Sequence, residues 1–281
     1  MKKRIEKIIR NSICFYAVIF AFQIQAEEKK AQSEAQVKGS PENTAIIPVQ
    51  KLENDFYDWH DRHKQVVDLI TKKPVDVIFI GDSITHMFGG VPKSRIARGS
   101  KTWERYYGHR NAINMGFGWD RTQNVLWRLA NVELEGIAPK VAVILIGTNN
   151  RTGTGNARQN TPEEIAQGVG AICKLIHKKA PNCKILLLAV LPRSPDRFVK
   201  PIKEINQLLS TLDKEEYISF LDMRDQFADD KGLPRKELMQ DTVHPNADGY
   251  QVWAATMEPV LSKLMSDQAV VPGKAAAVEG K

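Results

Sequence analysis

Five short, mostly apolar runs punctuate the middle of this 281-residue chain. Their apolar side chains do not alternate regularly with polar ones, a pattern typical of strands buried on both faces. A parallel sheet covered by helices on both sides is the arrangement that needs such strands. The predicted strands are Val75–Ile80, Ala112–Met115, Val141–Ile146, Lys184–Val190 and Tyr217–Leu221.

Helical periodicity fills the segments around these runs. Before the first strand, for example, apolar side chains recur at Phe56, Trp59, Val66 and Ile70, which places them on one helix face. The alternation of strands and helices predicts a three-layer α/β/α domain. Residues 87–101 contain Gly-Gly, Pro and scattered basic residues, and we expect an insertion-like loop there. The predicted helices are Phe56–Ile70, Thr122–Leu129, Pro162–Lys178, Val199–Leu212 and Ala247–Leu264.

Composition changes sharply at both ends of the chain. Residues 1–26 place basic side chains before an apolar run from Ile13 to Ile24, which predicts a secretory signal peptide. Ile24 is an unusual residue before a cleavage site, so an uncleaved anchor remains an alternative. Polar residues 27–48 read as a linker and residues 267–281 as a loose tail, leaving one domain at 49–266.

The net charge of +7 overstates the basic character of the mature chain. Residues 1–26 hold five basic residues and one acidic residue, so their removal leaves about +3. The remaining Lys and Arg residues do not form clusters interleaved with aromatic residues. The sequence therefore predicts no nucleic-acid partner. It also predicts no membrane span after processing.

Two cysteines of the predicted domain, Cys173 and Cys183, lie ten residues apart. Export would place them in an oxidising compartment, where they are able to pair. Two small buried side chains around a helix-to-strand turn explain them equally well. Both interpretations stay open at the level of sequence.

Ser83 follows the first predicted strand directly, within Gly81-Asp82-Ser83-Ile84. Parallel sheets gather their chemistry at the carboxyl ends of their strands, although Gly-Asp-Ser also occurs as plain turn chemistry. A serine nucleophile needs a base. His244 suits this role because it precedes the last predicted helix and follows an acid, Asp241, by three residues. A carboxylate at that spacing is able to orient the imidazole and stabilise its protonated form.

Acyl transfer also needs hydrogen-bond donors for the developing oxyanion. Asn149 follows the predicted strand Val141–Ile146, so its amide is expected at the same sheet edge as Ser83. The segment 114–120, with its Gly-x-Gly, follows another strand and is able to offer a backbone N–H. The N–H of Ser83, at a helix amino terminus, is the third expected donor. Each segment alone has an ordinary explanation as a turn.

Together, the Gly-Asp-Ser, Gly-x-Gly, Gly-Thr-Asn and Asp-x-x-His blocks resemble the SGNH, or GDSL, hydrolase family over roughly residues 56–264. The branch that looks most similar contains the catalytic subunits of platelet-activating-factor acetylhydrolase. The stretches that carry this likeness are Asp76–Ser83, Val125–Leu129, Pro139–Val141, Gly147–Asn150 and Leu191–Arg193.

The resemblance implies a flavodoxin-like sheet of five parallel strands and an ester hydrolase without metal or cofactor. It implies Ser83 as nucleophile, His244 as base, Asp241 as orienting acid and Asn149 as oxyanion donor. Counting back from Asn149, the family's oxyanion glycine falls at Trp119, with Gly118 just before it. The backbone N–H groups of Gly118 and Trp119 are the expected donors there, and the indole is expected either to crowd the acyl pocket or to lie on the surface loop.

The leading hypothesis is therefore a secreted esterase, with an acetylated carbohydrate as the first substrate to consider. Alternatives are an acetyl-phospholipid esterase, a thioesterase, and a glycan-binding module without turnover. A homodimer is left open. Among the other candidates, we expect His86 in a helix or at a pocket rim, and His60 and His63 on a helix face rather than at zinc. Arg193 is expected in a solvated loop, with a place near the site rim as the alternative.

Overall fold

A five-stranded parallel sheet forms the centre of the protein, in the order β2-β1-β3-β4-β5. The computed structural model describes residues 42–134 and 136–270. The predicted signal peptide and most of the predicted linker and tail lie outside these residues. The strands are β1 Val77–Gly81, β2 Ala112–Gly116, β3 Val141–Leu145, β4 Lys184–Leu188 and β5 Ile218–Leu221.

The register brings the carboxyl ends of the first three strands level. Gly81 at the end of β1 lies opposite Gly116 of β2 and Leu145 of β3. Every residue of these three strands is buried, which explains their unbroken apolar sequence. The predicted parallel sheet and α/β class are thus confirmed, and the loops that follow β1, β2 and β3 meet at one edge.

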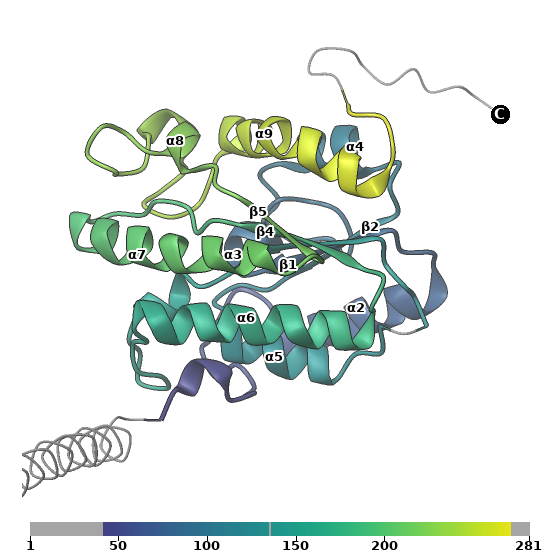
Figure 1. The fold of residues 1–281 in the computed structure, drawn as a ribbon, viewed down its shortest axis with the longest axis horizontal. Helices are drawn as coiled ribbons and strands as arrows, with labels where there is room; N and C mark the ends of the chain where they lie inside the picture. The colour runs from purple at the N-terminus through teal and green to yellow at the C-terminus, as the bar shows by residue number, and fades with distance from the viewer. Residues whose placement is uncertain (1–41, 135, 271–281) are drawn as a thin grey trace, which may run out of the picture. The chain divides into compact units, whose positions relative to one another are not determined.

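Helices cover both faces of the sheet (Figure 1). Buried side chains of α2, α5, α6 and α7 share one core with one face of the sheet, whereas those of α3, α4, α8 and α9 share a second core with the other face. This is the predicted three-layer arrangement. The helices are α2 Trp59–Lys72, α3 Ser83–His86, α4 Ser100–Tyr107, α5 Thr122–Ala130, α6 Pro162–Lys179, α7 Val199–Ser210, α8 Arg224–Phe227 and α9 Ala247–Met265.

Short elements at two ends of the domain extend it beyond the predicted limits. Ala45, in the 3₁₀ helix η1 (Thr44–Ile46), is fully buried, and its carbonyl accepts a hydrogen bond from the Thr122 hydroxyl. At the other end, the Asp267 carboxylate pairs with Arg110 at 2.8 Å. Ala45 and Asp267 therefore contact the domain, although they lie outside the predicted limits of 49 and 266.

The structure corrects the prediction for residues 87–101 and decides between the two interpretations of Cys173 and Cys183. The predicted loop 87–101 ends inside α4, which buries three aromatic side chains, Trp103, Tyr106 and Tyr107. Cys173 and Cys183 are both buried free thiols, so the packing interpretation holds. Burial raises the pKa of each thiol to about 12, which makes both poor nucleophiles.

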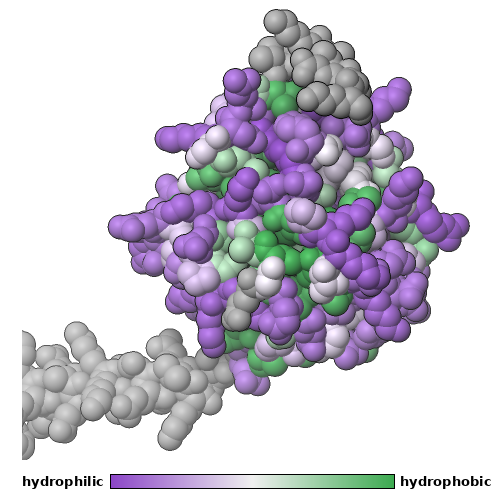
Figure 2. All heavy atoms as spheres, turned by 90° about the vertical axis from the view of Figure 1, so that its right-hand side faces the viewer, coloured by the Kyte–Doolittle hydropathy of each residue, from purple (hydrophilic) through white to green (hydrophobic). Residues whose placement is uncertain are grey.

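In the part of the chain that the structure describes, no helix is long and apolar enough to cross a membrane. On the face shown in Figure 2, hydrophobic residues gather in the middle of a hydrophilic rim.

Candidate active site

Ser83 is the first residue of α3 and follows β1 after a single connecting residue. That residue, Asp82, caps the helix, because its Oδ1 accepts a hydrogen bond from the Ile84 N–H at 2.9 Å. Gly81 permits the sharp exit from the strand: a Cβ there would lie 2.2 Å from the Thr85 hydroxyl oxygen. The local sequence thus leaves the Ser83 N–H at a helix amino terminus, where intrahelical partners are lacking.

His244 lies within hydrogen-bond reach of Ser83, although the two are 161 positions apart in the sequence. Its Nε2 is 2.8 Å from Ser83 Oγ, and its Nδ1 is 2.8 Å from Asp241 Oδ2. An Nδ1 that donates to a carboxylate leaves Nε2 free to accept the serine proton. The structure therefore joins the three predicted residues in one chain of hydrogen bonds, here called the candidate triad.

A short loop, residues 239–245, carries His244 and Asp241. An antiparallel bridge between Met239 and Pro245 closes it, and the Gln240 N–H donates to the His244 carbonyl at 2.8 Å. Tyr250, in the helix that follows, donates from its hydroxyl to the Ile84 carbonyl at 2.6 Å. This buried contact ties the base-bearing end of α9 to the helix of the serine.

Asp241 is unusually exposed for an orienting acid, with 44% of its side chain accessible. Partial desolvation acts to raise its pKa, but hydrogen bonds from the amides of His244 and Val243 and from the His244 ring outweigh that effect and lower the pKa. Asp241 therefore stays ionised at neutral pH. An ionised carboxylate is the state that stabilises a protonated imidazole.

The turn after β2, residues 116–121, lies beside Ser83. Its Phe117 N–H donates to the Gly81 carbonyl at 3.0 Å. The Gly118 N–H points to His86 Nδ1 at 3.2 Å and is therefore already engaged. Of the two donors expected in this turn, the structure leaves Trp119, whose N–H has no hydrogen-bond partner among the described residues. His86 is buried in α3, as one of the two expectations for it allowed.

Trp119 adopts the left-handed conformation, with φ of 61°. This region costs a side-chain-bearing residue about 1 kcal/mol or more and favours glycine, the residue that the family resemblance implies at this position. The indole remains 39% exposed, so it lies at the surface of the turn rather than in the core. The backbone thus keeps a glycine-like conformation and adds an aromatic side chain beside the candidate triad.

Asn149 opens a short helix, η2 (Asn149–Arg151), directly beyond β3. One hydrogen of its side-chain amide is used by the Asp120 carbonyl at 3.1 Å, which leaves the second hydrogen available. Arg193 donates to the carbonyl of Thr148 at 3.0 Å and to the hydroxyl of Thr152 at 3.1 Å. The prediction that Arg193 is solvated is therefore wrong: it holds the segment that carries Asn149.

The comparison with known proteins agrees with this geometry. A model of the GDSL-like lipase/acylhydrolase family matches residues 79–252, more than half of the chain. The chain belongs to this family. Human platelet-activating factor acetylhydrolase IB subunit alpha2 is 33% identical to this GDSL-like hydrolase over 231 residues, which cover 80% of the chain and 93% of that protein.

Solved structures share the fold of this GDSL-like hydrolase. A platelet-activating-factor protein from Streptococcus pneumonia has a TM-score of 0.59 at 22% identity, covering 72% of this chain and 92% of the other. A mutant acetyl-xylooligosaccharide esterase from Geobacillus has a TM-score of 0.52 at 18% identity, covering 70% and 96%. These likenesses show the fold, whereas the family match and the acetylhydrolase relatives identify the protein as a carboxylic ester hydrolase.

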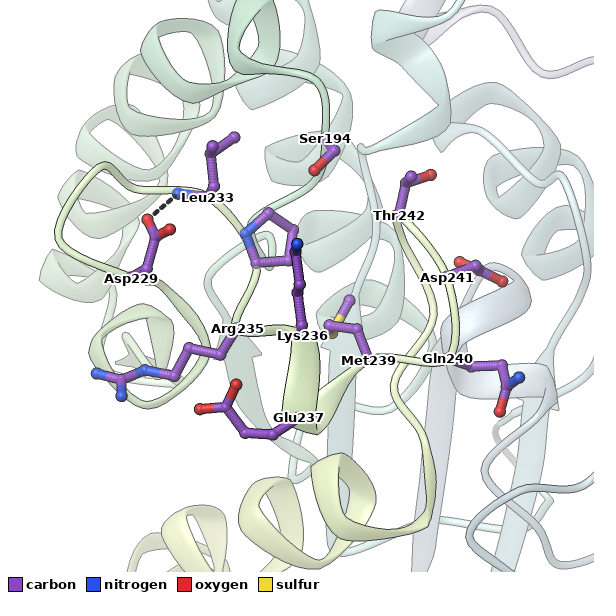
Figure 3. A pocket seen from close by; sticks show the side chains of 11 residues that line it. Ser194, Asp229, Leu233, Arg235, Lys236, Glu237, Met239, Gln240, Asp241 and Thr242 are labelled. Atoms are coloured by element: carbon purple, nitrogen blue, oxygen red, sulfur yellow. Dashed lines mark hydrogen bonds between the residues drawn. The ribbon is translucent and has the colours of Figure 1, made fainter.

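A cavity of about 660 Å³ flanks the candidate triad of this GDSL-like hydrolase. Figure 3 shows that it lies between the segment 229–237 and residues 239–242, with Ser194 at one end. It includes Asp241 and Thr242 but neither Ser83 nor His244, so it adjoins the reacting atoms without containing them. Most of its other side chains are polar: Asp229, Arg235, Lys236, Glu237 and Gln240.

No group of three or more His, Cys, Asp or Glu side chains that could hold a metal ion occurs in residues 42–134 and 136–270. His60 and His63 belong to α2, where His63 stacks on Trp59 with ring centroids 6.1 Å apart. Burial lowers the pKa of His63 to about 4, so this imidazole is neutral at pH 7.

Proposed function

We propose that this GDSL-like hydrolase is an exported serine esterase that removes a small acyl group, in the first instance acetyl, from a carbohydrate alcohol. The observation that carries the proposal is the unbroken hydrogen-bond chain from Ser83 through His244 to Asp241, with 2.8 Å at each junction. It lies at the sheet edge where Asn149 and the 116–121 turn also end. A nucleophile, a base and oxyanion donors thus meet at one place.

In acylation, Ser83 Oγ attacks the ester carbonyl while His244 Nε2 takes the hydroxyl proton. The carbonyl oxygen becomes an oxyanion, which accepts hydrogen bonds from the N–H groups of Ser83 and Trp119 and from the Asn149 amide. Collapse of this intermediate breaks the ester C–O bond. The protonated His244 gives its proton to the departing alkoxide, and an acyl-serine remains.

Deacylation repeats the steps with water as the nucleophile. His244 takes a proton from water, whose oxygen attacks the acyl carbonyl of the Ser83 ester. The second tetrahedral intermediate collapses, His244 returns the proton to Ser83 Oγ, and the carboxylic acid leaves. Asp241 stays ionised throughout and stabilises the imidazolium.

The relatives support a small acyl group. The names of the human relative and the Geobacillus esterase both specify an acetyl group. The amide, hydroxyl and charged side chains that line part of the cavity beside Asp241 support a hydroxylated alcohol, since they match the hydrogen-bonding groups of a sugar.

An acetylated phospholipid is the second candidate substrate. It is favoured by the 33% identity to platelet-activating factor acetylhydrolase IB subunit alpha2. The basic and apolar order of residues 1–26 supports export, which favours a substrate outside the cytoplasm. The two substrates differ in the polarity of the alcohol, and a direct comparison of turnover separates them.

The test uses the full chain expressed with its amino-terminal segment. We expect the exported product to begin near residue 27 and to release acetate from acetylated xylooligosaccharides faster than from platelet-activating factor or from butyrate and octanoate esters. Ser83→Ala should lower turnover by at least about 10³-fold, because the nucleophile is removed. Loss of labelling by a fluorophosphonate probe should accompany it.

Ser210→Ala is the matched control, since Ser210 lies at the solvent-exposed end of α7 and should retain full activity. An unchanged Ser83→Ala enzyme would overturn the serine mechanism. Preference for the phospholipid would transfer the proposal to the second substrate. A product that keeps residues 1–26 would replace secretion by anchoring.

A further inference from the structure

The peptide bond between Gly118 and Trp119 is held from behind by two side chains. The Gly118 carbonyl oxygen accepts hydrogen bonds from Lys51 Nζ at 3.3 Å and from the Tyr57 hydroxyl at 3.1 Å. Both donors come from the segment before α2, more than 60 residues earlier in the chain and outside the residues that the family model matches. The N–H of the same peptide group, that of Trp119, is the proposed oxyanion donor.

Lys51 is deeply buried, and Tyr57 is partly buried beside it. Only 2% of the Lys51 side chain is exposed, and its Nζ forms an ion pair with Asp55 Oδ2 at 3.2 Å. The same Nζ lies 4.8 Å from the centre of the Tyr57 ring. Gly118 leaves room for this cluster, since a Cβ there would lie 2.3 Å from Asp55 Oδ2. A buried ammonium of this kind exerts a strong field because little water screens it.

Tyr57 remains a proton donor at neutral pH. Desolvation raises the pKa of its hydroxyl above the ordinary value, and the carboxylates of Asp120 and Asp55 raise it further. Its ring packs edge-on against His86, with centroids 4.5 Å apart. His86 in turn accepts the Gly118 N–H. The peptide groups on both sides of Gly118 are therefore fixed by buried side chains.

Because the peptide group is planar, the direction of the Gly118 carbonyl also fixes the direction of the Trp119 N–H. In a trans peptide the C=O and N–H bonds point in opposite directions. A carbonyl that faces Lys51 and Tyr57 therefore directs the Trp119 N–H away from them, and that N–H has no partner among the described residues. Hydrogen bonds to the carbonyl also polarise the amide and make its N–H a stronger donor.

We propose that Lys51 and Tyr57 are positioning residues that aim and polarise the Trp119 N–H toward the oxyanion. The inference rests on the proposed serine esterase function and deepens it. Their positive charge and hydroxyl dipole act through one peptide unit and favour the negative charge that appears only in the tetrahedral intermediate. They therefore promote turnover without contributing to binding of the neutral ester.

The experiment compares Lys51→Met and Tyr57→Phe with the wild-type full chain. Removal of an oxyanion donor costs about 10²–10³ in kcat, so weakening one should lower kcat by about tenfold for each variant while KM changes by less than about twofold. Lys140→Met and Tyr217→Phe are matched controls. Lys140 lies just before β3 and Tyr217 just before β5, at the opposite ends of the strands from Ser83, and both variants should retain wild-type kcat.

A trifluoromethyl ketone supplies a readout that a loosened turn alone would not give. Its adduct with the serine carries the oxyanion, so its affinity should fall in proportion to kcat/KM across the variants. The affinity of a neutral, unreactive substrate amide should stay constant. Equal losses for both ligands, or wild-type kcat in both variants, would overturn the positioning role.

The activity measurements distinguish failure of the proposed function from failure of the role assigned to Lys51 and Tyr57. A wild-type protein without Ser83-dependent esterase activity refutes the proposed function and, with it, this inference. An active, Ser83-dependent enzyme that tolerates both substitutions refutes only the role of Lys51 and Tyr57. Tyr57→Phe removes a single oxygen atom, so it provides the decisive result if Lys51→Met fails to fold and leaves Asp55 unpaired.

Discussion

The two sides of the candidate active site are built in opposite ways. On the base side, Asp241 and His244 lie on a short surface loop, with 44% and 22% of their side chains exposed, and their contacts are mostly local. On the oxyanion side, the 116–121 turn is held by hydrogen bonds to buried side chains. There Asp120 accepts hydrogen bonds from Trp59 at 2.7 Å and from Arg128 at 2.8 Å, and all three side chains are buried.

This difference matches what each side has to do. A general base must exchange protons with an alcohol and with water, so access to solvent suits His244. Oxyanion donors contribute most when they are fixed before the reaction and need no reorganisation. Buried ion pairs and hydrogen bonds supply that rigidity, at a cost in desolvation. The comparison predicts that substitutions on the base side mainly affect activity, whereas those on the oxyanion side also affect folding.

The largest effect is expected from the base side. Asp241→Asn should lower kcat by about 10³-fold, because an amide neither selects the required imidazole tautomer nor stabilises the imidazolium. The melting temperature should change by only a few degrees, since the side chain is exposed. Steady-state kinetics and thermal unfolding measure the two quantities. Asp222→Asn, an exposed carboxylate paired with Arg224, is the control and should match the wild type in kcat.

If Asp241→Asn instead unfolded the protein, or left kcat within tenfold of the wild type, the contrast between the two sides would not hold. The first result would make Asp241 structural. The second would assign the orientation of His244 to the surrounding backbone.

The next largest effect is expected on stability, from the ion pair between Arg128 and Asp120 in the 116–121 turn. Arg128→Met should lower the free energy of unfolding by about 3–5 kcal/mol, because it strands the buried Asp120 carboxylate. Urea denaturation measures this loss. Adding Asp120→Asn should recover part of it, since the amide carries no charge. A fully additive pair of losses would contradict the buried ion pair as the source of rigidity.

The smallest effect concerns Asp82, between the two sides. Complete burial, with a further contribution from Asp120, raises the pKa of this carboxyl to about 7, and its Oδ2 has no hydrogen-bond partner. The native state then binds the proton more tightly than the unfolded state, whose carboxyl titrates near 3.9. The associated stability is present below about pH 4 and is lost as the pH rises to about 7.

The wild type should therefore lose roughly 1–3 kcal/mol more stability than Asp82→Asn between pH 4 and pH 7, less than the full pKa difference implies because proteins relax around buried charge. Urea titrations of both proteins at each pH give this difference, and subtracting one from the other cancels the remaining groups. A difference that does not vary with pH would show that Asp82 is ionised throughout.

Sequence patterns were sufficient for the sheet because its strands are buried on both faces. The run Val141–Ile146 is too short for a buried helix and does not alternate with polar residues, so a strand buried on both faces is the structure it favours. The candidate triad followed from the same logic, since parallel strands bring their carboxyl ends together. The helix α4 was missed although Trp103, Tyr106 and Tyr107 carry helical spacing, because the Gly-Gly and Pro before it suggested a loop.

No sequence pattern predicts the hydrogen bonds from Lys51 and Tyr57 to the Gly118 carbonyl. Lys51 lies in a polar stretch and Tyr57 at the edge of a predicted helix, so each suggests an exposed residue. Their burial depends on a carbonyl more than 60 residues away. Arg193 was misjudged for the same reason, because only the fold brings Thr148 and Thr152 to it.

The sequence separation of 161 positions from Ser83 to His244 also bears on the order in which the protein is made. The serine leaves the ribosome early, whereas its imidazole belongs to a loop that joins the domain only when α9 is synthesised and docks. Until then the serine hydroxyl has no base within reach. Incomplete or carboxyl-terminally truncated chains should therefore be inert toward esters, and hydrolysis would begin only once the whole domain has closed.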